Sequence, residues 1–373
     1  MSSQAPEQPE EQPPPYLELH RRSYTVLYGA AQRGKVDLLR RLLMDDRFLV
    51  LSQPLKAALE NEHWECAELV MDAIESAVVR ELPSSHVGSL HDAYASAADV
   101  YETHAAYEVV KLGQHYPVVE NGEEEEECLD ATDLGLSTED GKRLGRLLLR
   151  LLRLITAFPD PSWTETVLVE GSTSRFALPT AAAALGDMDL LEHLLHVAPD
   201  CVHLSGHDDA RPIHYACATG RLDIIRRLHA HDPSCVTQPT SSGMLPVHFA
   251  AQELSGAALR LVAELAPQTL GTPVSFGYID HTALTLAARA GSLAAVQAIL
   301  ELAPAMFQAP IDPEQERPIL AALRCQHMGI VELLLQHGTP EQLGPASVGG
   351  WTALHHAARW FPDAVGPVLR CVA

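Results

Sequence analysis

The feature that most constrains the fold is a sequence segment that recurs along the C-terminal half of the chain. Its copies start at Ala177, Arg211, Leu245, Thr282, Arg317 and Thr352. Successive starts are separated by 34, 34, 37, 35 and 35 residues. A proline recurs with nearly the same spacing, at Pro199, Pro233, Pro267 and Pro304. Two features that share one period indicate a linear array of similar units, in which each unit packs only against its neighbours.

Each copy predicts two short helices joined by a tight turn. The first helix contains adjacent alanines, such as Ala287 and Ala288, which allow neighbouring helices to approach closely. The second helix carries apolar pairs four residues apart, such as those that begin at Leu190 and Leu194, and this spacing predicts one buried stripe. Glycine closes several of the first helices, because it readily adopts the left-handed conformation of a helix end. These glycines are Gly186, Gly220 and Gly291.

Weaker copies precede the regular array. Residues 25–43 and 53–71 have the same two-helix pattern, and residues 89–118 are interpreted as a degenerate unit. The segment 144–158 is interpreted as the second helix of another such unit, because it ends in Phe-Pro-Asp much as a regular copy ends in Ala-Pro-Asp. We therefore expect about eight to ten units in all.

The starts of the first helices resemble the Thr-Pro-Leu-His motif of the ankyrin-repeat family. The nearest matches are Arg211-Pro212-Ile213-His214, Leu245-Pro246-Val247-His248 and Thr352-Ala353-Leu354-His355. The 33-residue unit of that family, with its two helices, also matches the period. The resemblance implies an all-α ankyrin-repeat solenoid, in which stacked helix-turn-helix units are joined by hairpin-like loops. It also implies that the motif histidines bond backbone groups between repeats, and that the chain is a non-catalytic scaffold or adaptor that binds proteins.

Composition suggests the domain limits. Residues 1–20 form a Pro/Glu-rich tail that we expect to be disordered, and residues 21–118 hold the partly degenerate N-terminal repeats. Residues 119–141 read as an acidic linker or insertion, and residues 142–373 as the C-terminal repeat block. The formal net charge of −23 argues against a nucleic-acid binder. The seven dispersed cysteines form no Cys-x-x-Cys pair, and no secretory signal or long apolar run is present. We therefore expect an intracellular, cytoplasmic protein without a transmembrane segment.

The sequence offers little for catalysis. No nucleophile elbow, phosphate-binding loop or His-Glu-x-x-His motif occurs, so we expect no enzymatic activity and no cofactor. One alternative is a metal-dependent hydrolase that would use the histidines and cysteines near His203 and His207. We instead predict that these histidines and cysteines have a structural role, since their spacing does not match a regular set of zinc ligands.

The segment 142–158 is basic and amphipathic. Its arginines fall on one face (Arg143, Arg146, Arg150 and Arg153), and its apolar residues on the other (Leu144, Leu148, Leu151 and Ile155). One interpretation is a helix that docks a calmodulin-like partner or a membrane surface. The favoured interpretation is a packed repeat helix, whose basic face is neutralised by the acidic stretch before it.

The partner-binding residues are predicted from their place in the repeat. Arg289 and Arg359 directly follow the alanine pair of a first helix, and Arg324 stands at the equivalent site of the repeat between them. In the resembled family this position contacts partners, and Trp360 follows Arg359. The hairpin-like loops add Phe276, Tyr278, His281 and Trp351. Because stacking would bring the three arginines into one row, we expect a protein partner that presents an acidic or phosphorylated segment.

Overall fold

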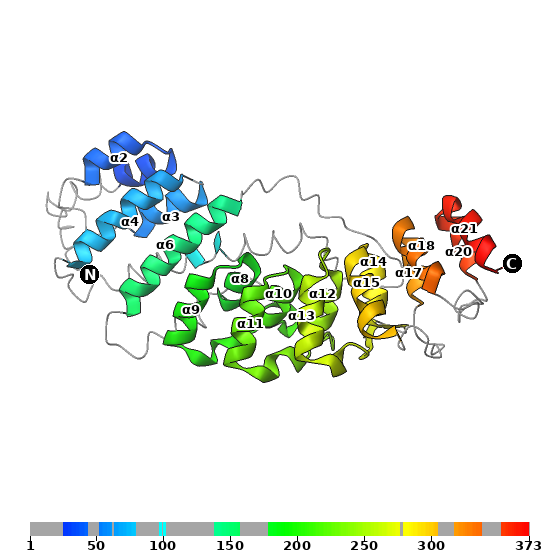
Figure 1. Ribbon diagram of the computed structural model, residues 1–373. Coiled ribbons are helices and arrows are strands. Elements are labelled where there is room, and N and C mark those ends of the chain that lie inside the picture. The colour runs from blue at the N-terminus through cyan, green and yellow to red at the C-terminus, as the bar shows by residue number, and fades with distance from the viewer. Residues whose placement is uncertain are drawn as a thin grey trace, which may run out of the picture. The chain divides into compact units, whose positions relative to one another are not determined.

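A computed structural model describes ten segments of the chain. They are residues 25–43, 52–61, 63–79, 97–98, 100–101, 138–156, 178–276, 279–304, 317–337 and 352–372. These residues fall into two compact units. The first unit holds the described residues up to 100 together with 146–156, and the second holds residues 101, 138–145 and those from 178 onward. Helices make up most of both units (Figure 1).

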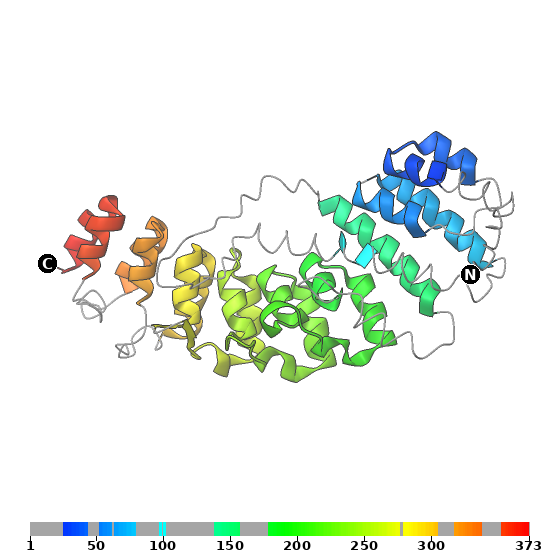
Figure 2. The same ribbon diagram turned by 180° about the vertical axis from the view of Figure 1, so that it is seen from behind.

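The second unit is a stack of helix pairs (Figure 1 and, from behind, Figure 2). The first helices are α8 (Leu178–Leu185), α10 (Pro212–Ala218), α12 (Pro246–Gln252), α14 (Ala283–Ala290), α17 (Pro318–Arg324) and α20 (Ala353–Trp360). The second helices are α9 (Met188–Val197), α11 (Leu222–His231), α13 (Ala257–Leu265), α15 (Leu293–Leu302), α18 (Met328–His337) and α21 (Val365–Val372). Each first helix packs against the first helix of the next pair and against its own second helix. The predicted all-α repeat array is therefore confirmed over these residues.

Short elements connect the pairs. The 3-10 turns are η2 (Pro199–His203), η3 (His207–Asp209), η4 (Pro233–Thr237), η5 (Pro267–Thr269) and η6 (Pro362–Ala364). The recurring prolines open three of these turns, where a residue without an N–H is tolerated. One connection contains an antiparallel hairpin of β1 (Val274–Phe276) and β2 (Ile279–His281), in which Val274 pairs with His281 and Phe276 with Ile279.

Five of the six predicted repeat starts coincide with helix N-caps, and the sixth, Ala177, lies outside the described residues. Arg211, Leu245, Thr282, Arg317 and Thr352 are the N-caps of α10, α12, α14, α17 and α20. The hydroxyl of Thr282 accepts the N–H of Thr285 at 3.3 Å, and that of Thr352 accepts the N–H of His355 at 3.4 Å. These bonds satisfy helix N–H groups that have no partner inside the helix.

Two motif histidines join consecutive repeats. Nδ1 of His214 accepts the N–H of Arg211 at 3.0 Å, while Nε2 donates to the carbonyl of Gln238 at 3.0 Å. His248 repeats this arrangement, accepting from Leu245 at 2.9 Å and donating to Thr272 at 2.8 Å. Both imidazoles are fully buried, and burial lowers the pKa of each to about 4. The predicted role in bonding backbone between repeats is confirmed for this pair.

The glycines that close the first helices also mark close approaches between repeats. Gly186, Gly220 and Gly291 have φ values of +77°, +69° and +78°. A Cβ atom at Gly186 would lie 2.9 Å from the side chain of Arg221, and one at Gly291 would lie 2.7 Å from that of His327. The His327 Nε2 atom donates to the carbonyl of Arg289 at 3.0 Å. The glycine therefore admits a side chain of the next repeat, which hydrogen-bonds the end of the preceding first helix.

The alanine pairs of α12 and α14 are fully buried in the stack. Ala287 of α14 is fully buried, between first helices that pack on both sides. Ala287→Leu is expected to lower the free energy of unfolding by about 1–3 kcal/mol, because the added methyl groups force these helices apart. Urea unfolding followed by circular dichroism measures the change. Ala290→Leu, at the half-buried last residue of the same helix, is the control and should change stability little; equal effects of the two changes would contradict the close-packed layer.

The first unit contains further helix pairs. Helical residues 25–32 precede α2 (Val36–Leu43), and α3 (Ser52–Glu60) precedes α4 (Trp64–Val79). Gly34, with a φ of +63°, lies in the turn before α2. These pairs confirm the two-helix pattern predicted for 25–43 and 53–71. The unit predicted at 89–118 lies outside the described residues apart from 97–98 and 100–101.

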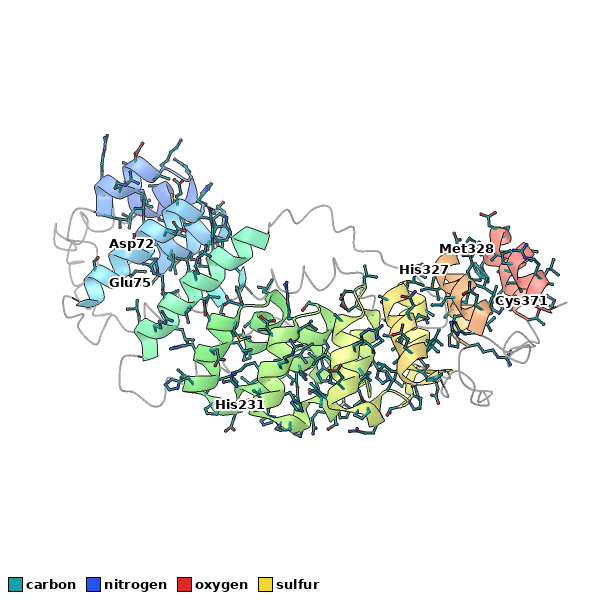
Figure 3. The ribbon with its side chains drawn as sticks, in the orientation of Figure 1. Asp72, Glu75, His231, His327, Met328 and Cys371 are labelled. Carbon is teal, nitrogen blue, oxygen red and sulfur yellow. The ribbon has the colours of Figure 1, made fainter. Side chains whose placement is uncertain are left out.

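The basic amphipathic segment forms α6 (Thr138–Thr156). Its apolar face is buried, through Leu144, Leu147, Leu148, Leu151 and Leu152. Its Arg150 donates 2.7 Å and 2.8 Å bonds to the carboxylate of Glu75 and a 2.6 Å bond to that of Asp72. Both carboxylates belong to α4, where Figure 3 labels them. The bidentate bond to Arg150 holds the pKa of the Glu75 carboxyl below its ordinary value. The packed-helix interpretation is thereby favoured, and the charge of Arg150 is neutralised by two carboxylates of α4.

Candidate functional site

The three predicted arginines occupy corresponding places in three consecutive repeats. Arg289 is in the last turn of α14, Arg324 ends α17, and Arg359 is in the last turn of α20. Because α14 packs on α17 and α17 on α20, these helix ends follow one another along the stack. Arg289 and Arg324 are half-buried and Arg359 is exposed. A guanidinium at a helix C-terminus is favourable, since the carbonyl groups there carry partial negative charge.

Trp360 is a large aromatic side chain at the surface. Its exposed fraction is 43%. The guanidinium carbon of Arg359 lies 4.8 Å from the centroid of its ring. This distance is within the range of a cation–π interaction, which orients the guanidinium over the indole. The end of α20 therefore presents a cation and an apolar plane side by side.

Of the four predicted hairpin residues, the structure describes Phe276 and His281. Phe276 is the last residue of β1, and His281 is the last residue of β2. The His281 side chain is only 3% exposed, so it belongs to the interior of the hairpin connection and offers little surface to a partner. Tyr278 and Trp351, which were also predicted to bind a partner, lie outside the described residues.

Gln326 is a surface residue that the motif analysis did not identify. Its φ is +59°, in the left-handed region where Gly186, Gly220 and Gly291 stand at the same position of other repeats. A residue with a Cβ atom costs about 1 kcal/mol in that conformation. The Gln326 side chain donates from Nε2 to the carbonyl of Trp360 at 3.0 Å, and it is exposed. In the sequence, this residue is marked only by the absence of the glycine that other repeats carry at the same position.

The cysteines and histidines near His203 do not assemble a metal site. Within the described ranges, no three His, Cys, Asp or Glu side chains are placed to hold one ion. Burial raises the pKa of the Cys201 and Cys235 thiols to about 12, and that of Cys217 above its ordinary value. These thiols are therefore protonated at neutral pH. His203 is exposed on η2.

Among the helices that the structure describes, none combines the length and the apolar composition needed to cross a membrane.

Comparison with known proteins identifies the repeat. The family model of ankyrin repeats (3 copies) matches residues 180–271 and 284–366. Over these residues the chain belongs to the ankyrin-repeat protein family. Ankyrin repeats generally mediate protein–protein interaction. No curated protein matches the chain.

Solved structures with similarity include two ankyrin repeat domains. That of human ASB11 is 19% identical, with 52% of this chain and 83% of that chain covered at a TM-score of 0.41. That of Bcl-3, a member of the IkappaB protein family, is 23% identical, with 52% of this chain and 86% of that chain covered at a TM-score of 0.41.

Proposed function

We propose that the protein is a non-catalytic scaffold or adaptor that binds a protein partner along the ends of its first helices. The observation that carries the proposal is the position of Arg289, Arg324 and Arg359 at corresponding helix ends of three stacked repeats. The stack exists before the partner arrives, so binding requires little ordering of this chain. Neither a cofactor nor a metal enters the proposal.

The charge of the arginines indicates the chemistry of the partner. The whole chain carries a formal net charge of −23, so a row of three arginines would be a positive region on an acidic protein. Three like charges in a row repel one another, and a bound anion would relieve that repulsion. A guanidinium pairs with a carboxylate or phosphate through two parallel hydrogen bonds. An acidic or phosphorylated segment of the partner would therefore complement the row.

The simultaneous replacement of Arg289, Arg324 and Arg359 by Ala tests this proposal. Partner binding is expected to weaken by more than about tenfold, because several charge-assisted bonds are lost. The thermal melt should change little, since none of the three side chains is fully buried. The partner is first recovered by affinity purification with the full chain, and its affinity for wild type and variant is then measured by calorimetry.

Two controls make that experiment decisive. Arg226→Ala removes an exposed arginine from the second helix α11 and should leave affinity unchanged. Raising the salt concentration should weaken binding of the wild-type chain more than that of the triple variant, because ions screen the arginines. If the triple variant folds and its affinity for the partner is unchanged, the arginines serve only the solubility of the surface.

A further inference from the structure

The ends of α17 and α20 bring three unusual features together. Gln326 adopts a left-handed conformation that glycine would adopt at lower cost, and it bonds the carbonyl of Trp360. Trp360 leaves 43% of its side chain exposed. The guanidinium of Arg359 lies over the indole ring. Strained backbone concentrates at binding sites, and Trp and Arg are enriched in protein interfaces.

These two repeats lack the acidic excess of the rest of the chain. Residues 317–337 and 352–372 contain more basic than acidic side chains. The basic residues are Arg317, Arg324, Arg359 and Arg370, and the acidic residues are Glu332 and Asp363. The stretch from Arg317 to Ala373 also contains Glu341, so its four basic and three acidic residues give a formal net charge of +1, whereas the whole chain carries −23. That contrast favours an anionic ligand at this end of the stack.

We propose that this surface recognises a short peptide segment in which an acidic residue stands next to a large apolar one. The guanidinium of Arg359, oriented by the indole, binds the carboxylate through parallel hydrogen bonds. The exposed part of Trp360 packs against the apolar side chain. Gln326 is a positioning residue, because its bond to the Trp360 carbonyl fixes the end of α20 against α17. This inference rests on the proposed function and names the chemistry of its partner.

The geometry favours a peptide over an anionic membrane. An acidic lipid surface would attract the arginines but repel a chain whose formal net charge is −23. The single indole offers one apolar contact flanked by one oriented cation, which suits a pair of side chains on one backbone. A lipid surface would instead be met by a broad apolar face ringed with cations.

The test uses the full chain and a displayed library of short random peptides. Wild-type protein is expected to enrich peptides in which Asp or Glu neighbours Leu, Ile, Phe or Met. Trp360→Ala should remove the apolar preference while the acidic preference persists, and Arg359→Gln should do the reverse. Leu254→Ala, which shortens another exposed apolar side chain (60% exposed), is the matched control and should leave the selected peptides unchanged.

Affinity measurements on one selected peptide complete the test. Trp360→Ala is expected to weaken binding by about tenfold or more, the loss typical of a central aromatic contact. Gln326→Gly should weaken binding severalfold although its melting temperature stays equal or rises, because glycine relieves the left-handed strain. A purely structural role for Gln326 would leave the affinity unchanged.

Three outcomes would overturn the inference. The first is a library that enriches no sequence class. The second is a set of acidic peptides whose binding depends on Arg289 and Arg324 but not on Trp360. That result would contradict the inference but would still support the proposed function. The third is sedimentation of the chain with phosphatidylserine vesicles that is lost in Arg359→Gln and Trp360→Ala, since it would assign the same surface to lipid.

Discussion

Acidification from about pH 7 to about pH 4 is expected to destabilise the repeats around α10 and α12 strongly. His214 and His248 are buried, and each uses both ring nitrogens to bond backbone groups as a neutral imidazole. Burial lowers the pKa of each from 6.5 to about 4. A protonated ring could no longer accept the N–H of its N-cap residue, so the native state resists protonation.

The direction of the effect follows from which state binds protons. Below the ordinary pKa of 6.5 the unfolded chain takes up a proton on each imidazole, whereas the folded chain does so only near pH 4. The unfolded state is thus favoured progressively as the pH falls through this window, and the full stabilisation is present above it. A pKa difference of this size corresponds to about 3 kcal/mol for each histidine.

Urea unfolding at several pH values, followed by circular dichroism, measures the effect. The variant that carries both His214→Gln and His248→Gln should be less stable at neutral pH, but its stability should fall less steeply between about pH 6.5 and pH 4. His196→Gln is the control, since His196 is exposed on α9 and its loss should keep the wild-type slope. Equal slopes in all three proteins would contradict the role given to the two buried imidazoles.

Much of the C-terminal stack was predictable because its interactions are local. The alanine pairs, the closing glycines and the apolar pairs each recur once per repeat, and each feature has the same physical role in every copy. Five repeat starts therefore fall on helix N-caps. The three arginines were found in the same way, from their place in the repeat. Their binding role stays a prediction, and so do the domain limits.

Contacts between distant residues were not predictable from the repeat. Arg150 bonds Glu75, which lies 75 residues earlier in the chain, and no motif links the two. The backbone carbonyl of Asp208 accepts the N–H of Ser241 at 2.9 Å, and its carboxylate bonds the hydroxyls of Ser241 and Ser242. Asp208 itself is left-handed, with a φ of +59°. Such loop contacts depend on conformations that the hydrophobic pattern does not encode.

Gln326 illustrates the same limit at the candidate site. The repeat pattern identifies its position as one that favours glycine, but it does not indicate where the longer side chain goes. The bond to the Trp360 carbonyl requires the next repeat to be in place. The stacking of Arg359 on Trp360 likewise depends on side-chain orientation, although the two residues are adjacent in the sequence.

A buried charge on α6 is expected to unfold the first unit. Leu148 is fully buried, on the apolar face of a helix whose Arg150 is held by Asp72 and Glu75 of α4. Leu148→Asp should lower stability by about 3–5 kcal/mol, because the carboxylate loses its hydration at a fully buried position. A loss of that size is comparable to the whole stability of a small domain.

The same substitution separates the two interpretations of α6. If α6 is a packed helix, Leu148→Asp removes a cooperative part of the thermal melt, while Arg146→Asp, on the exposed face of the same helix, changes it little. If α6 instead docks a partner, Leu148→Asp leaves the melt intact and abolishes calcium-dependent binding of calmodulin by the full chain. An isolated 142–158 peptide does not distinguish the two, because a free amphipathic helix exposes the apolar face that folding buries. The burial of Leu148 and the anchoring of Arg150 together favour the first result.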